Sequence, residues 1–238
     1  LPTGMDLVFS LISGAGWAFG QIITFKAFAL IGSSKAMPIT TAFQLLGASL
    51  WGVFALGDWP GVTNKIIGFT ALLVILIGAR MTVWKETQES QYSKNLKRAV
   101  ILLLIGEIGY WAYSAAPQAT DIGGMQAFLP QAMGMVIVAV VYALMNLKHQ
   151  NAFTESVSWK QIISGFFFAF AALTYLISAQ PDMNGLATGF VLSQTSVVLA
   201  TLTGIYFLKQ KKTPKELVIT IIGLVLILAA ATVTVFIK

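Results

Sequence analysis

Long runs of hydrophobic residues alternate with short polar connections along the 238 residues of this chain. Each run holds about 18 or more mostly apolar residues, which is the length a helix needs to cross a bilayer. The runs are too long and too even for the apolar–polar alternation of membrane strands. The pattern therefore predicts an all-α, polytopic membrane protein with eight helices in this chain, over residues 7–30, 36–57, 63–84, 99–116, 124–147, 159–180, 185–208 and 215–237.

The first run contains the glycine-rich stretch "LISGAGWAFGQIITF", Leu11 to Phe25. Gly14, Gly16 and Gly20 give G-x-G-x-x-x-G, whereas a dinucleotide-binding loop needs G-x-G-x-x-G between a strand and a helix. The stretch is uncharged and the apolar run continues beyond it, which favours a helix. Gly16 and Gly20 then form a small-residue face that lets another helix approach closely. Such a face suits either static packing or a seam along which helices rock.

Composition supports the membrane class and excludes several kinds of chemistry. Hydrophobic residues make up 57% of the chain and charged residues only 10%, against about 25% charged residues in soluble domains. The chain has no cysteine and a single histidine, His149. Disulfides and thiolate chemistry are therefore excluded, no cluster has the spacing of metal ligands, and no metal or cofactor is expected.

The basic residues are distributed unevenly between the two sides of the predicted helix bundle. Apart from Lys65 and Lys238, every Lys and Arg lies in, or close to, the connections on one side. Because cytoplasmic connections are enriched in Lys and Arg, this side is predicted to face the cytoplasm of a bacterium. The Leu1 and Lys238 ends are then extracytoplasmic. The net charge of +6 is an orientation signal, and no nucleic-acid partner is expected.

Three segments are echoed in the same order about 150 residues later. "ISGAGWAFGQIITF" at Ile12 is echoed by "ISGFFFAFAALTYL" at Ile163, with an offset of 151 residues. "FQLLGASLWGVFAL" is echoed by "LSQTSVVLATLTGIYFL", and "IIGFTALLVILIG" by "IIGLVLILAAA". Any single match is weak, because apolar helices resemble one another by composition. Their common order indicates an internal repeat.

The offset between the repeats spans five helices, an odd number, so the two copies cross the membrane in opposite directions. Inverted-topology repeats are the architecture of many secondary transporters. The second repeat is predicted over residues 91–238 with five helices, and residues 1–90 hold three helices of the first. The repeat thus predicts two further helices before Leu1 and ten in all.

Five segments resemble a known family: "LISGAGWAFGQIITFKAF", "IGSSKAMPITTAFQLLGASLWGVF", "LLLIGEIGYW", "FLPQAMGM" and "NGLATGFVLSQTSVVLATLTGIYFLK". Through them, and over essentially its whole length, the chain resembles the glucose/ribose porter family of the drug/metabolite transporter superfamily. The resemblance implies a ten-helix secondary transporter that takes up a sugar, D-ribose, by alternating access with proton symport. Composition and spacing alone indicate only a small polytopic protein with an inverted repeat.

Neutral polar and aromatic side chains inside the spans are candidates for binding a sugar. Amides both donate and accept hydrogen bonds, and Trp and Tyr rings pack on the apolar face of a sugar ring. Each such residue could equally serve as a hydrogen bond between helices. Because Gln44 and Gln194 occupy roughly matching places in the two repeats, a central substrate site is favoured. Its predicted members are Trp17, Gln21, Thr40, Thr41, Gln44, Tyr110, Trp111, Gln131, Ser193 and Gln194.

Glu107 is the only acidic residue in the interior of a predicted span. A carboxylate at mid-membrane is costly and is by default a functional candidate. Burial favours its protonated form, so the residue could take up and release a proton. Glu107 is therefore the predicted proton-coupling residue; the alternative is a permanently protonated side chain that bonds a neighbouring helix.

Other functions remain open beside D-ribose uptake. Glucose uptake by the same mechanism is one, and drug or metabolite export, common in the superfamily, is another. A membrane enzyme acting on lipid-linked substrates would need acids, histidines or basic residues clustered for catalysis at one membrane face, and the sequence holds none. The predicted partners are a small sugar, a proton and the lipid bilayer, with the oligomeric state unspecified.

Overall fold

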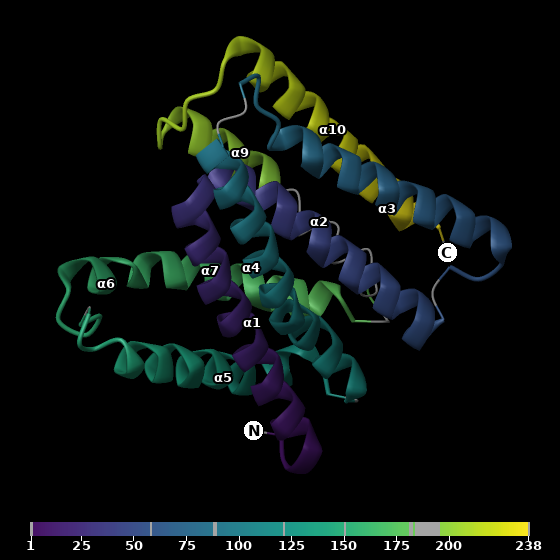
Figure 1. The fold of residues 1–238 in the computed structure, drawn as a ribbon. Coiled ribbons are helices and arrows are strands. Elements are labelled where there is room, and N and C mark those ends of the chain that lie inside the picture. Colours follow the sequence, from purple (N-terminus) through teal and green to yellow (C-terminus); the bar gives the residue numbers. More distant parts are fainter. Residues whose placement is uncertain are drawn as a thin grey trace. The chain divides into compact units, whose positions relative to one another are not determined.

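A computed structural model of the chain describes residues 2–57, 59–87, 90–120, 122–149, 151–180, 183 and 196–237. These residues form helices joined by short connections, with no strand among them (Figure 1). Short turns of π-helix and 3-10 helix, η1 and η2, extend α2 and α4. In chain order the elements are α1 (Gly4–Ile31), α2 (Ser33–Trp51), η1 (Gly52–Leu56), α3 (Val62–Thr82), α4 (Ser90–Ala115), η2 (Ala116–Ala119), α5 (Gly124–Met145), α6 (Ser156–Lys160), α7 (Ile162–Ser178), α9 (Ser196–Tyr206) and α10 (Pro214–Phe236).

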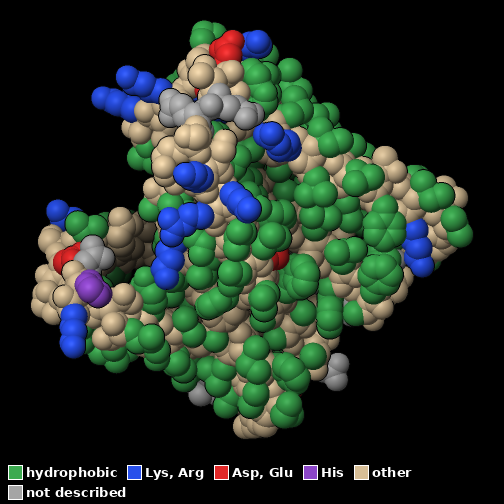
Figure 2. Space-filling view, viewed as in Figure 1, with side chains coloured by type: hydrophobic (Ala, Val, Ile, Leu, Met, Phe, Trp, Pro, Cys, Tyr) green, Lys and Arg blue, Asp and Glu red, His purple; other side chains and the backbone are tan. Residues whose placement is uncertain are grey.

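Seven helical segments within the described residues are long and apolar enough to cross a membrane. They are α1, α2 with η1, α3, α4 with η2, α5, α6 with α7, and α10, and they coincide with seven of the predicted spans. Much of the eighth span, 185–208, lies outside the described residues, and its described part contains α9. Broad hydrophobic areas cover the visible surface (Figure 2), as a lipid-facing protein requires. The prediction of an all-α, multi-pass membrane protein is confirmed.

The start of α4 differs from the predicted start at residue 99. The helix begins at Ser90 and includes the basic residues Lys94, Lys97 and Arg98. Lys and Arg are good helix formers, and their long side chains reach the aqueous interface from a helix end. The change from polar to apolar sequence therefore marks where α4 enters the membrane, and the helix itself starts earlier.

The chain divides into two compact units. Unit 1 comprises residues 1–19 and 109–185, and unit 2 comprises residues 20–108 and 186–238. The helices α1 and α4 contribute a segment to each unit. The inverted repeat and its predicted boundary at residues 90 and 91 stay predictions.

Glycines of the stretch Leu11 to Phe25 let the first part of α1 approach two helices of unit 1. A Cβ on Gly14 would overlap the carbonyl oxygen of Gln131 in α5. A Cβ on Gly16 would lie 2.5 Å from the carbonyl oxygen of Gly109 and 2.9 Å from Cβ of Ala112, both in α4. Because no side chain fits at either position, these glycines permit backbone-to-backbone packing.

One hydrophobic core cluster of unit 2 is built by α1, α2 and α4 with Val83, which follows α3. Ala27, Ala36 and Ala99 are fully buried, which lets the three helices pack closely. Lipid is as apolar as the protein interior, so this packing rests on van der Waals contact rather than on the exclusion of water. The buried residues of the core are Ala27, Ile31, Ala36, Ile39, Val83, Ala99 and Leu103.

The connection after α9 supplies the cap for the start of α2. Gly32, with a φ of 80°, precedes α2, and no side chain caps the helix locally. Instead, Oε1 of Gln210 accepts a hydrogen bond from the backbone N–H of Ser34 at 2.9 Å, and Nε2 of Gln210 donates to Oγ of Ser33 at 3.1 Å. One of the orphan amide donors of α2 is thereby satisfied from a distant part of the sequence.

The helices α3 and α10 of unit 2 cross at a pair of facing glycines. A Cβ on Gly78 would lie 2.6 Å from the carbonyl oxygen of Gly223 and 2.9 Å from Cγ1 of Ile227. A Cβ on Gly223 would lie 2.5 Å from the carbonyl oxygen of Gly78. The contact is reciprocal, and backbone atoms cannot move aside as a flexible side chain could. The crossing therefore admits only glycine on both helices.

Gly78→Ala or Gly223→Ala is expected to lower the thermal unfolding temperature of the purified protein. Overpacking costs about 1–3 kcal/mol, which exceeds the roughly 1 kcal/mol that alanine gains over glycine in a helix. Gly165→Ala in α7 is the matched control, because a Cβ there meets nothing within 4 Å. Equal unfolding temperatures for all three variants would contradict the close crossing.

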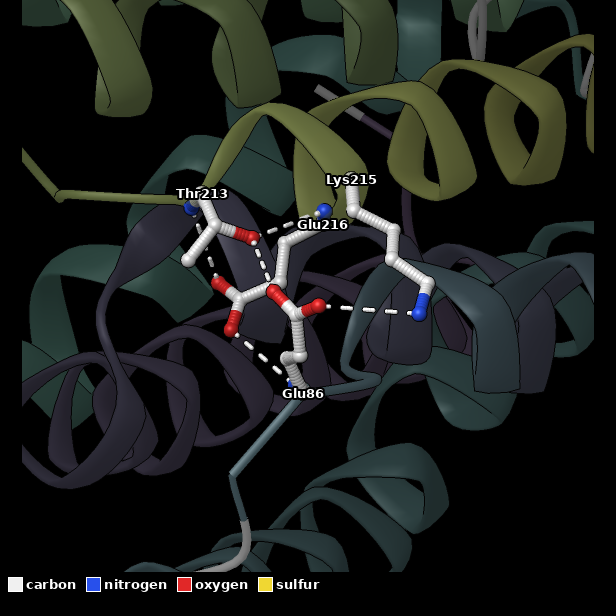
Figure 3. A network of polar contacts seen from close by, with 4 residues as sticks. All are labelled: Glu86, Thr213, Lys215 and Glu216. Carbon is white, nitrogen blue, oxygen red and sulfur yellow. Dashed lines mark hydrogen bonds and ion pairs between the residues drawn. The ribbon is translucent and has the colours of Figure 1, made fainter.

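A polar network joins the start of α10 to the connection between α3 and α4 (Figure 3). Thr213 and Glu216 form a capping box, in which Oγ1 of Thr213 accepts from the backbone N–H of Glu216 at 3.2 Å. The Glu216 carboxylate also accepts from the backbone N–H of Glu86 at 3.2 Å. Glu86 in turn accepts from the Thr213 hydroxyl at 3.0 Å and pairs with Lys215 at 3.5 Å. Both carboxylates are thus engaged in fixing these two segments.

Lys212 adds a further link between the same segments. Its ammonium donates to the carbonyl oxygen of Thr82, the last residue of α3, at 2.8 Å. A cation suits this position, because a helix C-terminus carries partial negative charge. Burial, and after it the charge of Lys35, nevertheless lowers the pKa of Lys212 from 10.5 to about 8.

Raising the pH from about 8 to 10.5 is expected to stabilise the wild-type protein relative to Lys212→Gln. Over this range the unfolded state binds more protons at residue 212 than the folded state does, so stability rises with pH. Thermal unfolding of both proteins at several pH values measures the difference. Lys211→Gln, at the exposed neighbouring residue, should show a smaller change. If the stability of the wild type relative to Lys212→Gln stays constant or falls as the pH rises, the lowered pKa of Lys212 is contradicted.

Candidate functional site

The predicted site residues divide between the two units. Ser193 and Gln194 lie outside the described residues. Because the units are described separately, the predicted convergence of the whole set on one cavity stays a prediction. Unit 1 holds Trp17, Tyr110, Trp111 and Gln131, and unit 2 holds Gln21, Thr40, Thr41, Gln44 and Glu107.

Gln131 is the centre of a buried polar cluster in unit 1. Its side chain is 1% exposed, and its Nε2 donates to Oγ of Ser13 in α1 at 2.6 Å. The Ser13 hydroxyl, also fully buried, donates to the backbone carbonyl oxygen of Tyr113 in α4 at 2.7 Å. One chain of hydrogen bonds thus links α5, α1 and α4 through an apolar bundle.

The carbonyl oxygen Oε1 of Gln131 is buried and has no hydrogen-bond partner among the described residues. The orientation of the amide follows from the network, because the Ser13 hydroxyl gives its proton to Tyr113 and must accept one from Gln131. An unpaired buried acceptor costs about 1–3 kcal/mol and calls for an explanation. It is a position where a donor such as a sugar hydroxyl would gain a hydrogen bond.

Local sequence explains why Gln131 lies at a helix crossing. The preceding Pro130 cannot donate a backbone hydrogen bond, which weakens α5 at this turn. A Cβ on Gly134, one turn later, would overlap the carbonyl oxygen of Leu11 in α1. The glycines Gly14 and Gly134 therefore bring α1 and α5 together on both sides of the Gln131–Ser13 bond.

Two stacked aromatic pairs join α1 and α4, which both contribute to this cluster, to α7. Trp17, one turn after Ser13 on α1, stacks on Phe168 of α7 with a centroid distance of 4.1 Å. The ring of Tyr113 stacks on Tyr175 of α7 at 5.8 Å. Stacking restrains these rings, and restrained aromatic faces suit the C–H surface of a sugar.

Tyr110 and Trp111, the two aromatic residues predicted on α4, differ in burial. Tyr110 is 7% exposed, whereas Trp111 is 47% exposed. They follow one another on a helix and so point about 100° apart. Burial therefore favours Tyr110 as the candidate, and the role of Trp111 stays a prediction.

The neutral polar candidates of α2 form a second cluster, in unit 2. Thr40 and Thr41 are 2% and 1% exposed. Gln44, one turn after Thr40, donates from Nε2 to Oγ1 of Thr40 at 3.2 Å. This bond lies within one helix, so it holds the amide of Gln44 in place without joining α2 to a neighbour. Gln21 of α1 is half-buried.

Glu107 is 3% exposed although it carries an ionisable carboxyl group. Leu103 and Ala99, one and two turns earlier on the same face of α4, belong to a buried hydrophobic cluster of unit 2. A Cβ on its neighbour Gly106 would lie 3.2 Å from Ile23 of α1. The acid therefore extends a tightly packed helix face, and a buried carboxyl group within a membrane span is a functional candidate.

Sequence reasoning missed Ser13 and the carbonyl of Tyr113 as members of the cluster. Ser13 lies one turn before Trp17 and is part of the echoed "ISG" motif, which was the available signal. The carbonyl carries no signal in the sequence. Within the described residues, no three His, Cys, Asp or Glu side chains are grouped to hold a metal ion.

Comparisons with known proteins agree on one family. The model of the family described as "Sugar transport protein" matches residues 1–237. A protein of Staphylococcus epidermidis (strain ATCC 12228) named "Putative ribose uptake protein RbsU" is 84% identical over 238 residues, which are 100% of this chain and 81% of that protein. A protein of the same name from Staphylococcus aureus (strain Mu50) is 79% identical over 237 residues, with the same coverage. No solved structure shows significant similarity.

Proposed function

Since this chain belongs to the sugar transport protein family, we propose that it is a secondary transporter that takes up D-ribose across the bacterial cytoplasmic membrane. The transporter works by alternating access and couples ribose uptake to an inward flow of protons. Its cytoplasmic face is the side that carries nearly all Lys and Arg residues. The names of the relatives from Staphylococcus support ribose as the sugar.

The buried amide of Gln131 is the single structural observation that carries the proposal. Its Nε2 is fixed by Ser13, and its Oε1 has no partner among the described residues. A ribose hydroxyl donates to Oε1, and the stacked indole of Trp17 offers an apolar face nearby on α1. The free energy of this hydrogen bond is gained only when the sugar is bound, because the acceptor is otherwise unsatisfied.

In unit 2, Thr40, Thr41 and Gln44 supply further neutral donors and acceptors. The hydroxyl–amide pair of Thr40 and Gln44 is already oriented by its own hydrogen bond. Glu107 binds the coupled proton, because it is a buried carboxyl group in a membrane-spanning helix. No charge is needed to bind the sugar itself, which is consistent with a transport site made of amides and hydroxyls.

Counterflow in proteoliposomes tests the substrate. Vesicles that hold the purified protein and are preloaded with unlabelled D-ribose are expected to take up radiolabelled D-ribose transiently above equilibrium, without any pH gradient. Unlabelled D-glucose added outside at the same concentration should compete less than unlabelled D-ribose. Equal competition by glucose would favour the glucose porter, and absence of counterflow with both sugars would contradict sugar transport by this chain.

A further inference from the structure

A basic pocket lies in unit 2, where α3 ends and α4 begins. Its volume is about 230 Å³, and its charged lining is Arg80, Lys85 and Lys97. Tyr92 and Ser93 add hydroxyl groups, and among the described residues no acidic side chain lines it. The volume exceeds the space of a single water many times. It is smaller than the pockets of about 300–1,000 Å³ that enclose drug-sized ligands.

Tyr92 organises the cations beside this pocket. Its hydroxyl donates to the carbonyl oxygen of Val83 at 2.7 Å, which ties the start of α4 to the end of α3. The ammonium of Lys85 lies 4.6 Å from the centroid of the Tyr92 ring, and that of Lys35 lies 5.3 Å from it. Two lysines are thereby held near one aromatic ring.

Two acids of this region that the structure describes, Glu86 and Glu216, are engaged with partners other than the lining of the pocket. Glu86 pairs with Lys215 and accepts from Thr213, while Glu216 caps α10 and accepts from the backbone of Glu86 (Figure 3). Among the described residues, Arg80, Lys85 and Lys97 form no ion pair. Burial is the largest cause of the low pKa of Lys212; the charges of Lys35 and Lys85 lower it further, and that of Glu216 opposes them.

An enrichment of Lys and Arg in cytoplasmic connections is enough to orient a protein in the membrane. It does not require these basic residues to enclose a pocket. We propose that this pocket binds the phosphate group of an anionic ligand, with Arg80, Lys85 and Lys97 neutralising its charge. A phosphate presents several acceptor oxygens, which matches the fork of a guanidinium, two ammonium groups and the hydroxyl of Ser93. The phosphate belongs either to a lipid headgroup in the cytoplasmic leaflet or to a soluble phosphorylated sugar.

Binding measurements on the intact purified protein separate these two sources. One arm titrates D-ribose 5-phosphate, and separately inorganic phosphate, into detergent-solubilised protein and follows thermal unfolding and calorimetric heat. The other arm compares unfolding in nanodiscs of phosphatidylcholine with unfolding in nanodiscs containing phosphatidylglycerol. The variants are Arg80→Gln with Lys97→Gln, and the charge-matched control Lys65→Gln with Lys148→Gln, whose lysines are exposed and outside the pocket.

In one of the two arms, the ligand or lipid is expected to raise the unfolding temperature of the wild-type protein by several degrees. This increase should be smaller for Arg80→Gln with Lys97→Gln and unchanged for the control, Lys65→Gln with Lys148→Gln. The apparent affinity of the pocket variant should fall at least about tenfold. A response confined to nanodiscs identifies a lipid headgroup, and a response confined to the soluble compounds identifies a phosphorylated metabolite. No response in either arm, or equal losses in both variants, would overturn the proposal, because surface charge alone would then explain the basic residues.

Discussion

Gln131→Met is expected to reduce D-ribose uptake at least about tenfold while leaving the unfolding temperature of the empty protein nearly unchanged. Methionine is unbranched and of similar length, so it fills the space of the amide without its polar atoms. The substitution removes the bond to Ser13, but it also removes the unsatisfied acceptor Oε1. These two effects are each about 1 kcal/mol and of opposite sign. Radiolabelled uptake and thermal unfolding measure the two quantities.

Measuring both uptake and stability separates a role of Gln131 in substrate binding from a purely structural role in joining helices. If the amide only joined helices, the variant would be less stable and its residual transport would follow the amount of folded protein. Gln126→Met on the same helix is the matched control, because Gln126 is exposed. It should keep both uptake and stability. Full uptake by Gln131→Met would remove Gln131 from the substrate site.

Glu107→Gln is expected to abolish accumulation of D-ribose against its gradient while preserving counterflow. The substitution keeps the size and hydrogen-bonding capacity of the protonated acid and removes its proton exchange. A charged acid at mid-membrane costs about 3 kcal/mol on insertion scales. Protonation can therefore determine which conformations of the transporter are populated. Without a titrating group, sugar still exchanges, but the pH gradient no longer drives the cycle.

Glu155→Gln is the control for this variant, because Glu155 is exposed in the connection before α6. It should accumulate ribose as the wild type does. Gradient-driven accumulation by Glu107→Gln would contradict proton coupling through Glu107. Loss of both accumulation and counterflow, with normal folding, would instead assign Glu107 to the substrate site.

The sequence was sufficient for the membrane-spanning segments, because length and hydropathy follow directly from the thickness of a bilayer. The predicted start of α4 lies nine residues after the start at Ser90 in the structure. The charged residues Lys94, Lys97 and Arg98 suggested a connection, although they belong to the helix. The packing face was predicted at Gly16 and Gly20, without Gly14, and its partner helices could not be assigned. Gly14 contacts α5 and Gly16 contacts α4, and that choice depends on how whole helices cross.

Parts of the candidate site were beyond sequence reasoning for a similar reason. The bond from Gln131 to Ser13 joins residues 118 positions apart, and its acceptor is an ordinary serine within an apolar run. The basic residues were interpreted from the sequence only as an orientation signal. Their grouping into a pocket depends on how the start of α4 lies against the end of α3, where the Tyr92 hydroxyl donates to the carbonyl oxygen of Val83.

The most direct test of the central claim is the accumulation of radiolabelled D-ribose by proteoliposomes under an imposed inward proton gradient. The account predicts that ribose accumulates above its external concentration, that a protonophore abolishes this accumulation, and that vesicles without protein show none. Accumulation that persists with the protonophore would contradict proton coupling. Absence of ribose entry from vesicles that hold correctly folded protein would contradict ribose transport itself.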